Sequence, residues 1–208
     1  MNWNREKRIR ELPKLLERNI LLFDGAMATM IQNHNLEEND YRGKDFKNHN
    51  CELKGNNDIL SITSPKIIKD IHKTFLNAGS DIVETNTFSS TSISQRDYQL
   101  ESISYELNYE AALIARKTCD NFEQERPELP KYVAGVLGPT NRTASISPDV
   151  NDAGARNIMY DDLYESYSLA AKGLINGGSD IIMIETIFDT LNAKAAINAV
   201  KDIFETLN

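Results

Sequence analysis

The sequence has few of the residues that build cross-linked or metal-bound domains. Its 208 residues include only two cysteines, Cys51 and Cys119. Two cysteines are too few for a disulfide framework, and their wide separation does not match a cysteine zinc site. The three histidines, His34, His49 and His72, are scattered along the chain. The cysteines and histidines therefore predict no metal site within this sequence.

Long hydrophobic runs and an excess of positive charge are also missing. The mean hydropathy is −0.46, and the aliphatic runs are far shorter than the roughly 20 residues of a membrane span. The first 20 residues contain no apolar signal core. The net charge is −8, which disfavours a phosphate-backbone partner. We therefore expect a cytoplasmic protein that binds neither membranes nor nucleic acid.

Short apolar runs that end in polar residues predict four strands, each followed by a helix. Strands with continuous apolar sequence are expected to be buried on both faces, and their alternation with helices favours a parallel α/β sheet. Strands are expected over 19–23, 81–88, 132–137 and 180–184. Helices are expected over 4–18 with a start weakened or shifted by Pro13, over 65–78, over 93–118, from Asp161 and after Asp189. Loops are expected over 36–63, 120–130 and 138–157.

A short internal repeat supports a recurring strand–helix unit. Residues 77–83, NAGSDIV, resemble residues 176–182, NGGSDII. Each segment combines the end of a helix, a glycine turn and the start of a strand. Carrying the alignment forward places Glu185 opposite Asn86. We therefore expect these two side chains at the same height on equivalent strand faces.

The polar clusters all follow predicted strands, where barrel enzymes build their sites. A closed barrel needs eight strands, so we interpret the chain as the N-terminal half or more of a (β/α)8 TIM barrel. Residues 1–208 would then form one domain that is incomplete at its C-terminus. An open, four-stranded Rossmann-like sheet is the alternative, although no glycine-rich dinucleotide fingerprint follows the first strand.

Two strand ends carry candidate functional residues. Asp24 and Gly25 follow the first predicted strand, and glycine permits a sharp turn or the close approach of a ligand to the backbone. Free N–H groups there could hold a carboxylate, although a plain strand-to-helix turn has the same sequence. Glu185 ends the fourth predicted strand. It is either a functional carboxylate or an ion-paired residue at a strand end.

Five motifs occur in an order that resembles a known family. The chain is similar to the amino-terminal homocysteine-binding domain of cobalamin-dependent methionine synthase, within the homocysteine S-methyltransferase family. The asparagine–arginine loop and the run SISPDVND at 145–152 point to the cobalamin-dependent branch. The five motifs are LFDGAM at 22–27, LKGNND at 53–58, ETNTF at 84–88, GPTNRT at 138–143 and ETIFDT at 185–190.

The resemblance implies methyl transfer from methylcobalamin to the thiol of homocysteine, which forms methionine. In the family, zinc held by three cysteines of later strands activates the thiol, and those cysteines are not in this chain. The cobalamin-binding and folate-binding modules of the full-length enzyme would be partners. No catalytic residue and no metal ligand is therefore assigned within this sequence. The alternative is a truncated, inactive substrate-binding module.

The resemblance also assigns roles to residues of this chain. Asp24 and Glu185 would hold the ammonium group of homocysteine, and the turn at Gly25 and Ala26 its carboxylate. Asn86 would orient the ligand. Asn141 and Arg142 would shape the face that meets the cobalamin module, although Arg142 is also a candidate for an ordinary salt bridge.

One position departs from the family pattern. Ala28 stands where the family usually has glycine. If the backbone there has a positive φ, alanine costs about 1 kcal/mol. If the backbone is helical, alanine is neutral or slightly favourable.

Overall fold

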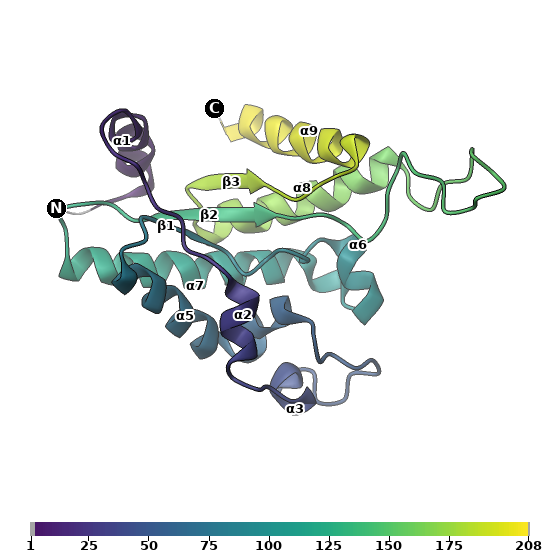
Figure 1. Cartoon of the computed structure of the whole chain (residues 1–208), viewed down its shortest axis with the longest axis horizontal. Helices are drawn as coiled ribbons and strands as arrows, with labels where there is room; N and C mark the ends of the chain where they lie inside the picture. Colours follow the sequence, from purple (N-terminus) through teal and green to yellow (C-terminus); the bar gives the residue numbers. More distant parts are fainter. Residues whose placement is uncertain (1–2, 208) are drawn as a thin grey trace.

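The fold is a parallel α/β arrangement, as the sequence predicts, and a computed structural model describes residues 3–207 (Figure 1). Met1, Asn2 and Asn208, which the predicted domain includes, lie outside the described residues. Three strands form one sheet in the order β1-β2-β3, and both pairings are parallel. The strands are β1 (Ile82–Glu84), β2 (Tyr132–Leu137) and β3 (Ile181–Ile184).

The helices that cover the sheet follow the order of the chain. α5, α7, α8 and α9 pack each against the next, and the apolar residues of β1, β2 and β3 that face them form the main core. The α-helices are α1 (Arg5–Arg18), α2 (Met27–Gln32), α3 (Glu38–Arg42), α4 (Leu60–Thr63), α5 (Pro65–Ala78), α6 (Ser92–Gln95), α7 (Ser104–Glu125), α8 (Tyr160–Gly177) and α9 (Thr190–Leu207). Three 3-10 turns are η1 (Asn57–Ile59), η2 (Arg96–Tyr98) and η3 (Glu101–Ile103).

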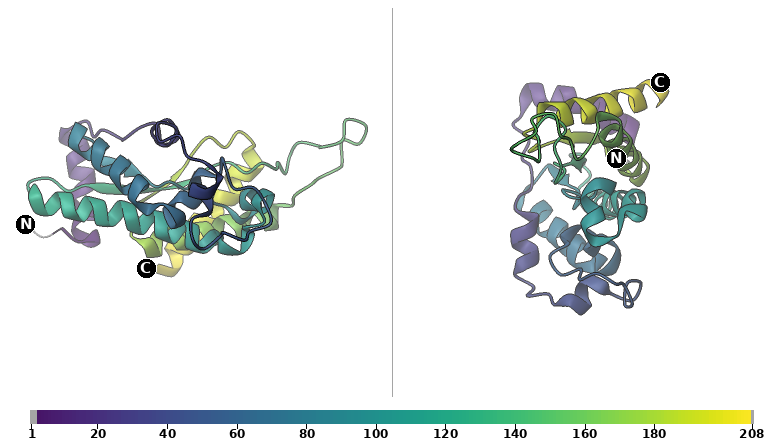
Figure 2. Two further views of the ribbon diagram at one scale, coloured as in Figure 1. Left: turned by 90° about the horizontal axis from the view of Figure 1, so that it is seen from below. Right: turned by 90° about the vertical axis from the view of Figure 1, so that its right-hand side faces the viewer.

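Among residues 3–207, the cluster on the opposite face of the sheet lies near the starts of β1 and β2. There Leu12 and Leu15 of α1 pack against Ile82, Tyr132 and Ala134. The hydroxyl of Tyr132 also donates to the carbonyl of Arg8. α1 therefore lies at one end of this face, and the loop 138–157 projects beyond the other end (Figures 1 and 2).

The prediction of a buried first strand over 19–23 is wrong. Only Phe23 forms a bridge, with Ile82 of β1, and the side chains of Leu22 and Phe23 are 56% and 45% exposed. The residues of β3 are likewise half-buried rather than buried on both faces. Both segments lie at an edge of the sheet, with a neighbour on one side only among residues 3–207. Side chains of both segments therefore remain partly exposed to solvent.

Several helix boundaries also differ from the prediction. The single helix expected over 93–118 is broken by the turns η2 and η3, because Gln99 has a φ of 54°. α7 continues to Glu125, since Phe122 and Glu123 are buried, so the loop expected over 120–130 begins later. α1 starts at Arg5 with Pro13 inside it. Arg5 and Arg8 bind α8 and Asp180, which holds this helix in place.

The helix caps were predicted in part. Asp189 caps α9, because its Oδ1 accepts from the backbone N–H of Leu191 at 2.8 Å, which confirms the expected cap. Asp161 does not cap α8. The helix begins at Tyr160, and Asp162 accepts from the N–H of Met159 instead.

The sequence repeat has a structural counterpart. Gly79 and Gly178 end α5 and α8 with φ values of 113° and 115°. Asp81 donates its N–H to the carbonyl of Leu22 and accepts from the N–H of Leu22 through its carboxylate. Asp180 makes the same pair of bonds with Val133. Each aspartate therefore fixes the start of a strand to the strand before it.

The strand order bears on the two alternatives for the sheet. The bridge of Phe23, then β1, β2 and β3 lie side by side in chain order. A doubly wound sheet reverses its strand order at a switch point, and the described strands contain no such reversal. Among residues 3–207, no helix is both long enough and apolar enough to cross a membrane.

Candidate functional site

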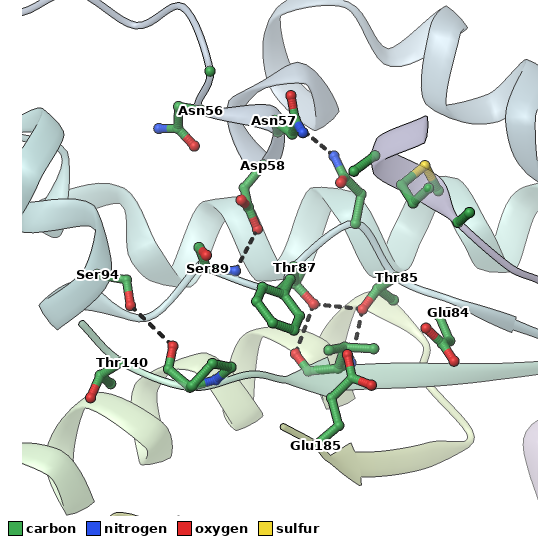
Figure 3. A pocket seen from close by; sticks show the side chains of 18 of the residues that line it. Asn56, Asn57, Asp58, Glu84, Thr85, Thr87, Ser89, Ser94, Thr140 and Glu185 are labelled. Atoms are coloured by element: carbon green, nitrogen blue, oxygen red, sulfur yellow. Dashed lines mark hydrogen bonds between the residues drawn. The ribbon is translucent and has the colours of Figure 1, made fainter. Parts of the chain in front are cut away.

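A cleft of about 630 Å³ opens at the carboxyl ends of the strands (Figure 3). Its walls are the turn after Phe23, the loop 55–58, the end of β1, the loop after β2 and the residue after β3. The structure brings together all five residues that the sequence analysis assigned to substrate binding. Asp24, Gly25, Ala26, Asn86 and Glu185 line the cleft, together with Asn141.

The cleft is acidic. Five carboxylates line it, and no lysine, arginine or histidine does so among the described residues. Two of the five accept hydrogen bonds from side chains: Asp58 accepts from Ser90, and Asp97 accepts from Asn141. The remaining three are Asp24, Glu84 and Glu185. Carboxylates without nearby cations create a negative potential that favours a positively charged ligand.

Asp24 is held at the edge of β1 with its side chain only 3% exposed. Its Oδ1 accepts from the backbone N–H of Glu84 at 3.0 Å. Its Oδ2 lies 3.9 Å from Nδ1 of His72, on α5. His72 is fully buried, and neither ring nitrogen has a hydrogen-bond partner in the described part of the chain. The carboxylate of Asp24 is therefore fixed from one side and approached by a polar ring from behind.

Glu84 was quoted in a sequence motif but was not assigned to the site. Burial, and then the negative charges of Asp24 and Glu185, raise the pKa of Glu84 to about 7. Burial also raises the pKa of Glu185. Removing a carboxylate from water disfavours its charged form in both residues, and two neighbouring like charges add to this effect only in Glu84. The alternation that places Glu84 and Asn86 on one face of the chain was the sequence signal for this residue.

The strands β1 and β2 separate at the cleft through two hydroxyl groups. The Oγ1 atom of Thr85 accepts from the N–H of Val136 at 2.9 Å, and Oγ1 of Thr87 donates to the carbonyl of Val136 at 2.8 Å. The two hydroxyls lie 2.6 Å apart (Figure 3). Side chains thus take the places of backbone groups in the ladder, and the inner side chains gain room.

The loop expected over 36–63 is partly helical, and its central part forms one wall of the cleft. Nδ2 of Asn86 donates to the carbonyl of Asn57 at 2.8 Å and to Oγ of Ser61 at 3.3 Å. Oδ1 of Asp58 accepts from Ser89 on the opposite side. Burial raises the pKa of Asp58. These bonds use the amide N–H groups of Asn86 and leave its Oδ1 without a partner among the described residues.

The turn after Asp24 presents free backbone donors. Gly25 and Ala26 are exposed, and their N–H groups make no hydrogen bond within residues 3–207. A Cβ at Gly25 would make only an ordinary contact with Phe75, at 3.8 Å. Neither the space nor the backbone therefore requires glycine here. Ala28 lies in α2 and has no positive φ, so the helical alternative, in which alanine costs nothing, holds.

Glu185 is positioned by an unusual backbone. Its N–H donates to the carbonyl of Leu137 at 3.1 Å. The next residue, Thr186, has a φ of 56°. A β-branched residue rarely adopts this conformation, which costs of order 1–3 kcal/mol and is concentrated at functional sites. The sequence carries no signal for it, since threonine normally avoids this region.

Asn141 and Arg142 do not lie together at the cleft. Asn141 lines it, whereas Arg142 does not. Arg142 forms no salt bridge with any described residue, and its buried Nε has no partner. Its carbonyl accepts from Thr140 and Asn192. The alternative of an ordinary salt bridge for Arg142 therefore has no counterpart within residues 3–207.

The cysteines lie outside the cleft. Cys119 is buried in α7, and burial raises the pKa of its thiol to about 12. Cys51 is half-buried in the segment after α3. Within the described part of the chain, no group of three or more histidine, cysteine, aspartate or glutamate residues is arranged to hold a metal ion.

Comparisons with known proteins agree with the motifs. The sequence matches the family model described as homocysteine S-methyltransferase over residues 21–207. Two crystal structures of the homocysteine methyltransferase MmuM from Escherichia coli share the fold. The metallated form has a TM-score of 0.70 and 20% identity over 92% of this chain and 62% of its own length. The oxidized form has a TM-score of 0.69 and 20% identity over 92% of this chain and 61% of its own length. The chain thus spans less than two thirds of these relatives.

Proposed function

The chain belongs to the homocysteine S-methyltransferase family, and from this premise we propose that its cleft binds homocysteine by the amino-acid end for methylation of the thiol. The observation that carries the proposal is the acidic cleft, lined by no basic residue among those described, beside a turn with two free backbone donors. A zwitterionic amino acid needs both kinds of partner, because its ammonium group binds carboxylates and its carboxylate binds N–H donors. Methionine is then the product.

Each end of the amino acid has a counterpart in the cleft. Asp24 and Glu185 accept from the ammonium group, since charge-assisted hydrogen bonds are the stronger kind. Oδ1 of Asn86, which the bonds of its Nδ2 hold in place, is a neutral third acceptor. The N–H groups of Gly25 and Ala26 donate to the carboxylate. The sulfur-bearing end then extends away from this turn.

We also propose that the sheet is part of a (β/α)8 barrel, which its stagger supports. In the sequence repeat, Ile181 of β3 is equivalent to Ile82 of β1. Their partners on β2 differ, because Ile82 pairs with Tyr132 and Ile181 pairs with Ala134. From β1 to β3, which is two steps across the sheet, equivalent positions are thus displaced by two residues along the strands. A barrel with eight strands and a shear number of eight has a stagger of one residue per step. The sequential strand order supports the same conclusion.

Residues 3–207 contain no group that would activate the thiol of homocysteine. Thiols with a pKa of about 8.5 react as thiolates, and a metal ion supplies that form when it is bound. Cys51 and Cys119 do not fit this role, because neither lines the cleft and Cys119 is fully buried. The family's zinc therefore has no site among residues 3–207. We propose that this chain supplies the amino-acid-binding part of the site, and that by itself it is an inactive binding module.

We further propose methylcobalamin as the methyl donor, presented by a cobalamin-binding module, with a folate-binding module as a second partner. The docking face would include Asn141 and Arg142. The projecting loop 138–157 supports this, because Ile146 and Val150 are 52% and 99% exposed. Exposed apolar residues on one loop are a feature of protein interfaces.

Calorimetric titration tests the assignment of the ammonium partner. The chain and its Glu185→Gln variant are titrated with L-homocysteine and with 4-mercaptobutanoate, which lacks the amino group. A charge-assisted hydrogen bond contributes roughly 1.5–3 kcal/mol, so affinity for homocysteine should fall about tenfold to a hundredfold. Affinity for the analogue should hardly change. Equal losses for both ligands, with a lower melting temperature, would instead mean that Glu185 has a structural role.

A further inference from the structure

We propose that Glu84 is the third carboxylate of the ammonium site, that it is partly protonated at neutral pH while the cleft is empty, and that it releases its proton to solvent when the amino group of the ligand binds. This inference rests on the proposed function, because it concerns the same cleft. It adds a proton to the binding equilibrium and a pH dependence to the affinity.

The position of Glu84 connects it to both proposed ammonium partners. It is the last residue of β1, and its backbone N–H holds the carboxylate of Asp24 at 3.0 Å. Its own carboxylate lines the cleft with that of Glu185 and makes no hydrogen bond with a described residue. Glu84 is half-buried. A half-buried carboxylate without a donor is stabilised in its protonated form.

The charged groups around Glu84 come from three sides. Asp24 lies on the turn before α2, with His72 of α5 behind it, and Glu185 lies beyond β3. On β2 the cleft is lined by Val136, which is uncharged. Asp58 and Asp97 also line the cleft, each with its own donors. No cation among the described cleft residues offsets these carboxylates.

His72 is an independent sign that the cluster is built for an ionic ligand. It is fully buried, its ring nitrogens have no hydrogen-bond partner among residues 3–207, and its Nδ1 lies 3.9 Å from Oδ2 of Asp24. Unpaired buried polar groups are uncommon in folded proteins and usually have a functional explanation. His72 is not one of the residues that line the cleft, so its ring contacts Asp24 from outside the cleft lining.

Ligand binding places one ammonium group among the carboxylates of the cleft. Without a ligand, burial and two like charges hold the pKa of Glu84 at about 7, so about half of the molecules carry the proton at pH 7. An ammonium group beside Glu84 favours the ionised form. The O–H bond of Glu84 then breaks, the proton passes to water or buffer, and the carboxylate faces the ammonium group.

Proton release is measured by titration calorimetry with L-methionine, which has no thiol that could add a proton of its own. The apparent enthalpy is measured at pH 7 in phosphate and in Tris, whose ionisation enthalpies differ. We expect release of about half a proton per methionine bound, and an affinity about tenfold weaker at pH 6 than at pH 8. Glu84→Gln should abolish both effects. Asp97→Asn should retain both, because Asp97 is already engaged by Asn141.

The outcomes separate this inference from the proposed function. Methionine binding without proton release, or release that persists in Glu84→Gln, overturns the role of Glu84 and leaves the function standing. No binding of methionine overturns the function and this inference with it. If Glu84→Gln does not fold, the carboxyl carbon of Glu84 is followed by NMR in the unaltered chain. Its titration midpoint should move from about 7 to below 6 with saturating methionine, and an unmoved midpoint overturns the inference.

Discussion

Nδ1 of His72 and Oδ2 of Asp24 lie 3.9 Å apart at the base of the cleft, and neither ring nitrogen forms a hydrogen bond with any residue that the structure describes. The imidazole is fully buried on α5, whereas Asp24 belongs to the turn that follows the first extended segment. The two elements therefore meet through a polar contact that is longer than a hydrogen bond. We expect this contact to lower the stability of the fold and to favour ligand binding in the cleft.

Replacing His72 with leucine should stabilise the fold. A buried polar group without a partner costs about 1–3 kcal/mol, so we expect the free energy of unfolding in urea to rise by about 1 kcal/mol. Affinity for L-methionine should fall, because Asp24 loses the polar ring behind it. His72→Gln is the matched control, since it keeps a polar group. A less stable His72→Leu chain would show that the ring makes a bond that the structure lacks.

Thr186 offers a test of stored strain. Thr186→Gly should raise the free energy of unfolding by about 1 kcal/mol, because glycine adopts a φ of 56° without strain. The same change at Thr190, the first residue of α9, should give no gain. Ligand affinity should fall in Thr186→Gly, since Glu185 becomes less rigidly held. Stabilisation by both substitutions, or by neither, contradicts a strained turn.

The repeated aspartates should differ in their contribution to stability. The side chain of Asp180 is 1% exposed, and its carboxylate pairs with Arg8 at 2.9 Å and Arg116 at 2.8 Å. Asp180→Asn should cost about 3 kcal/mol, because it leaves buried arginines partly unpaired. Asp81 is 19% exposed and pairs with Lys131 at 2.8 Å. Asp81→Asn should cost about 1 kcal/mol. Equal losses in urea unfolding would mean that the shared backbone bonds, rather than the ion pairs, dominate.

Glu84 should make the free energy of unfolding depend on pH and should lower it at alkaline pH. Its folded pKa of about 7 lies above its ordinary value of 4.5, so the folded state binds the proton more tightly than the unfolded state. Glu84 therefore lowers stability as pH rises from about 4.5 to 7. Glu84→Gln should be more stable than the unaltered chain at pH 8 and not at pH 4. Parallel pH profiles for the two chains would contradict the raised pKa.

The parts of the fold set by local sequence were predictable. The bounds of β2, the glycine that ends α5 and the cap at Asp189 all match the structure. Each depends on residues close in sequence, such as an apolar run, a left-handed glycine or a side chain that reaches the next turn. The cleft residues at the strand ends were also predictable. Each follows an apolar run that marks a strand, and parallel strands bring their carboxyl ends together.

The parts that depend on distant neighbours were not predictable. The exposure of Phe23 and of β3 depends on which strands lie beside them, and no local pattern reports that. The length of α7 depends on Phe122 and Glu123 finding a buried environment. Glu84 was overlooked because its raised pKa arises from burial, and then from the charges of Asp24 and Glu185, which are 60 and 101 residues away in the sequence.

The two threonine hydroxyls between β1 and β2 have a consequence for how such a cleft can change. Where backbone groups pair directly, the distance between two strands is fixed by the peptide unit and is the same for every sequence. At Thr85 and Thr87 the spacing is fixed by side chains, which a single codon can alter. Substitutions at these two threonines can therefore change the width of the cleft mouth while the backbone pairing of the sheet is kept. A cleft of this kind can adapt to ligands of another size without a change of fold.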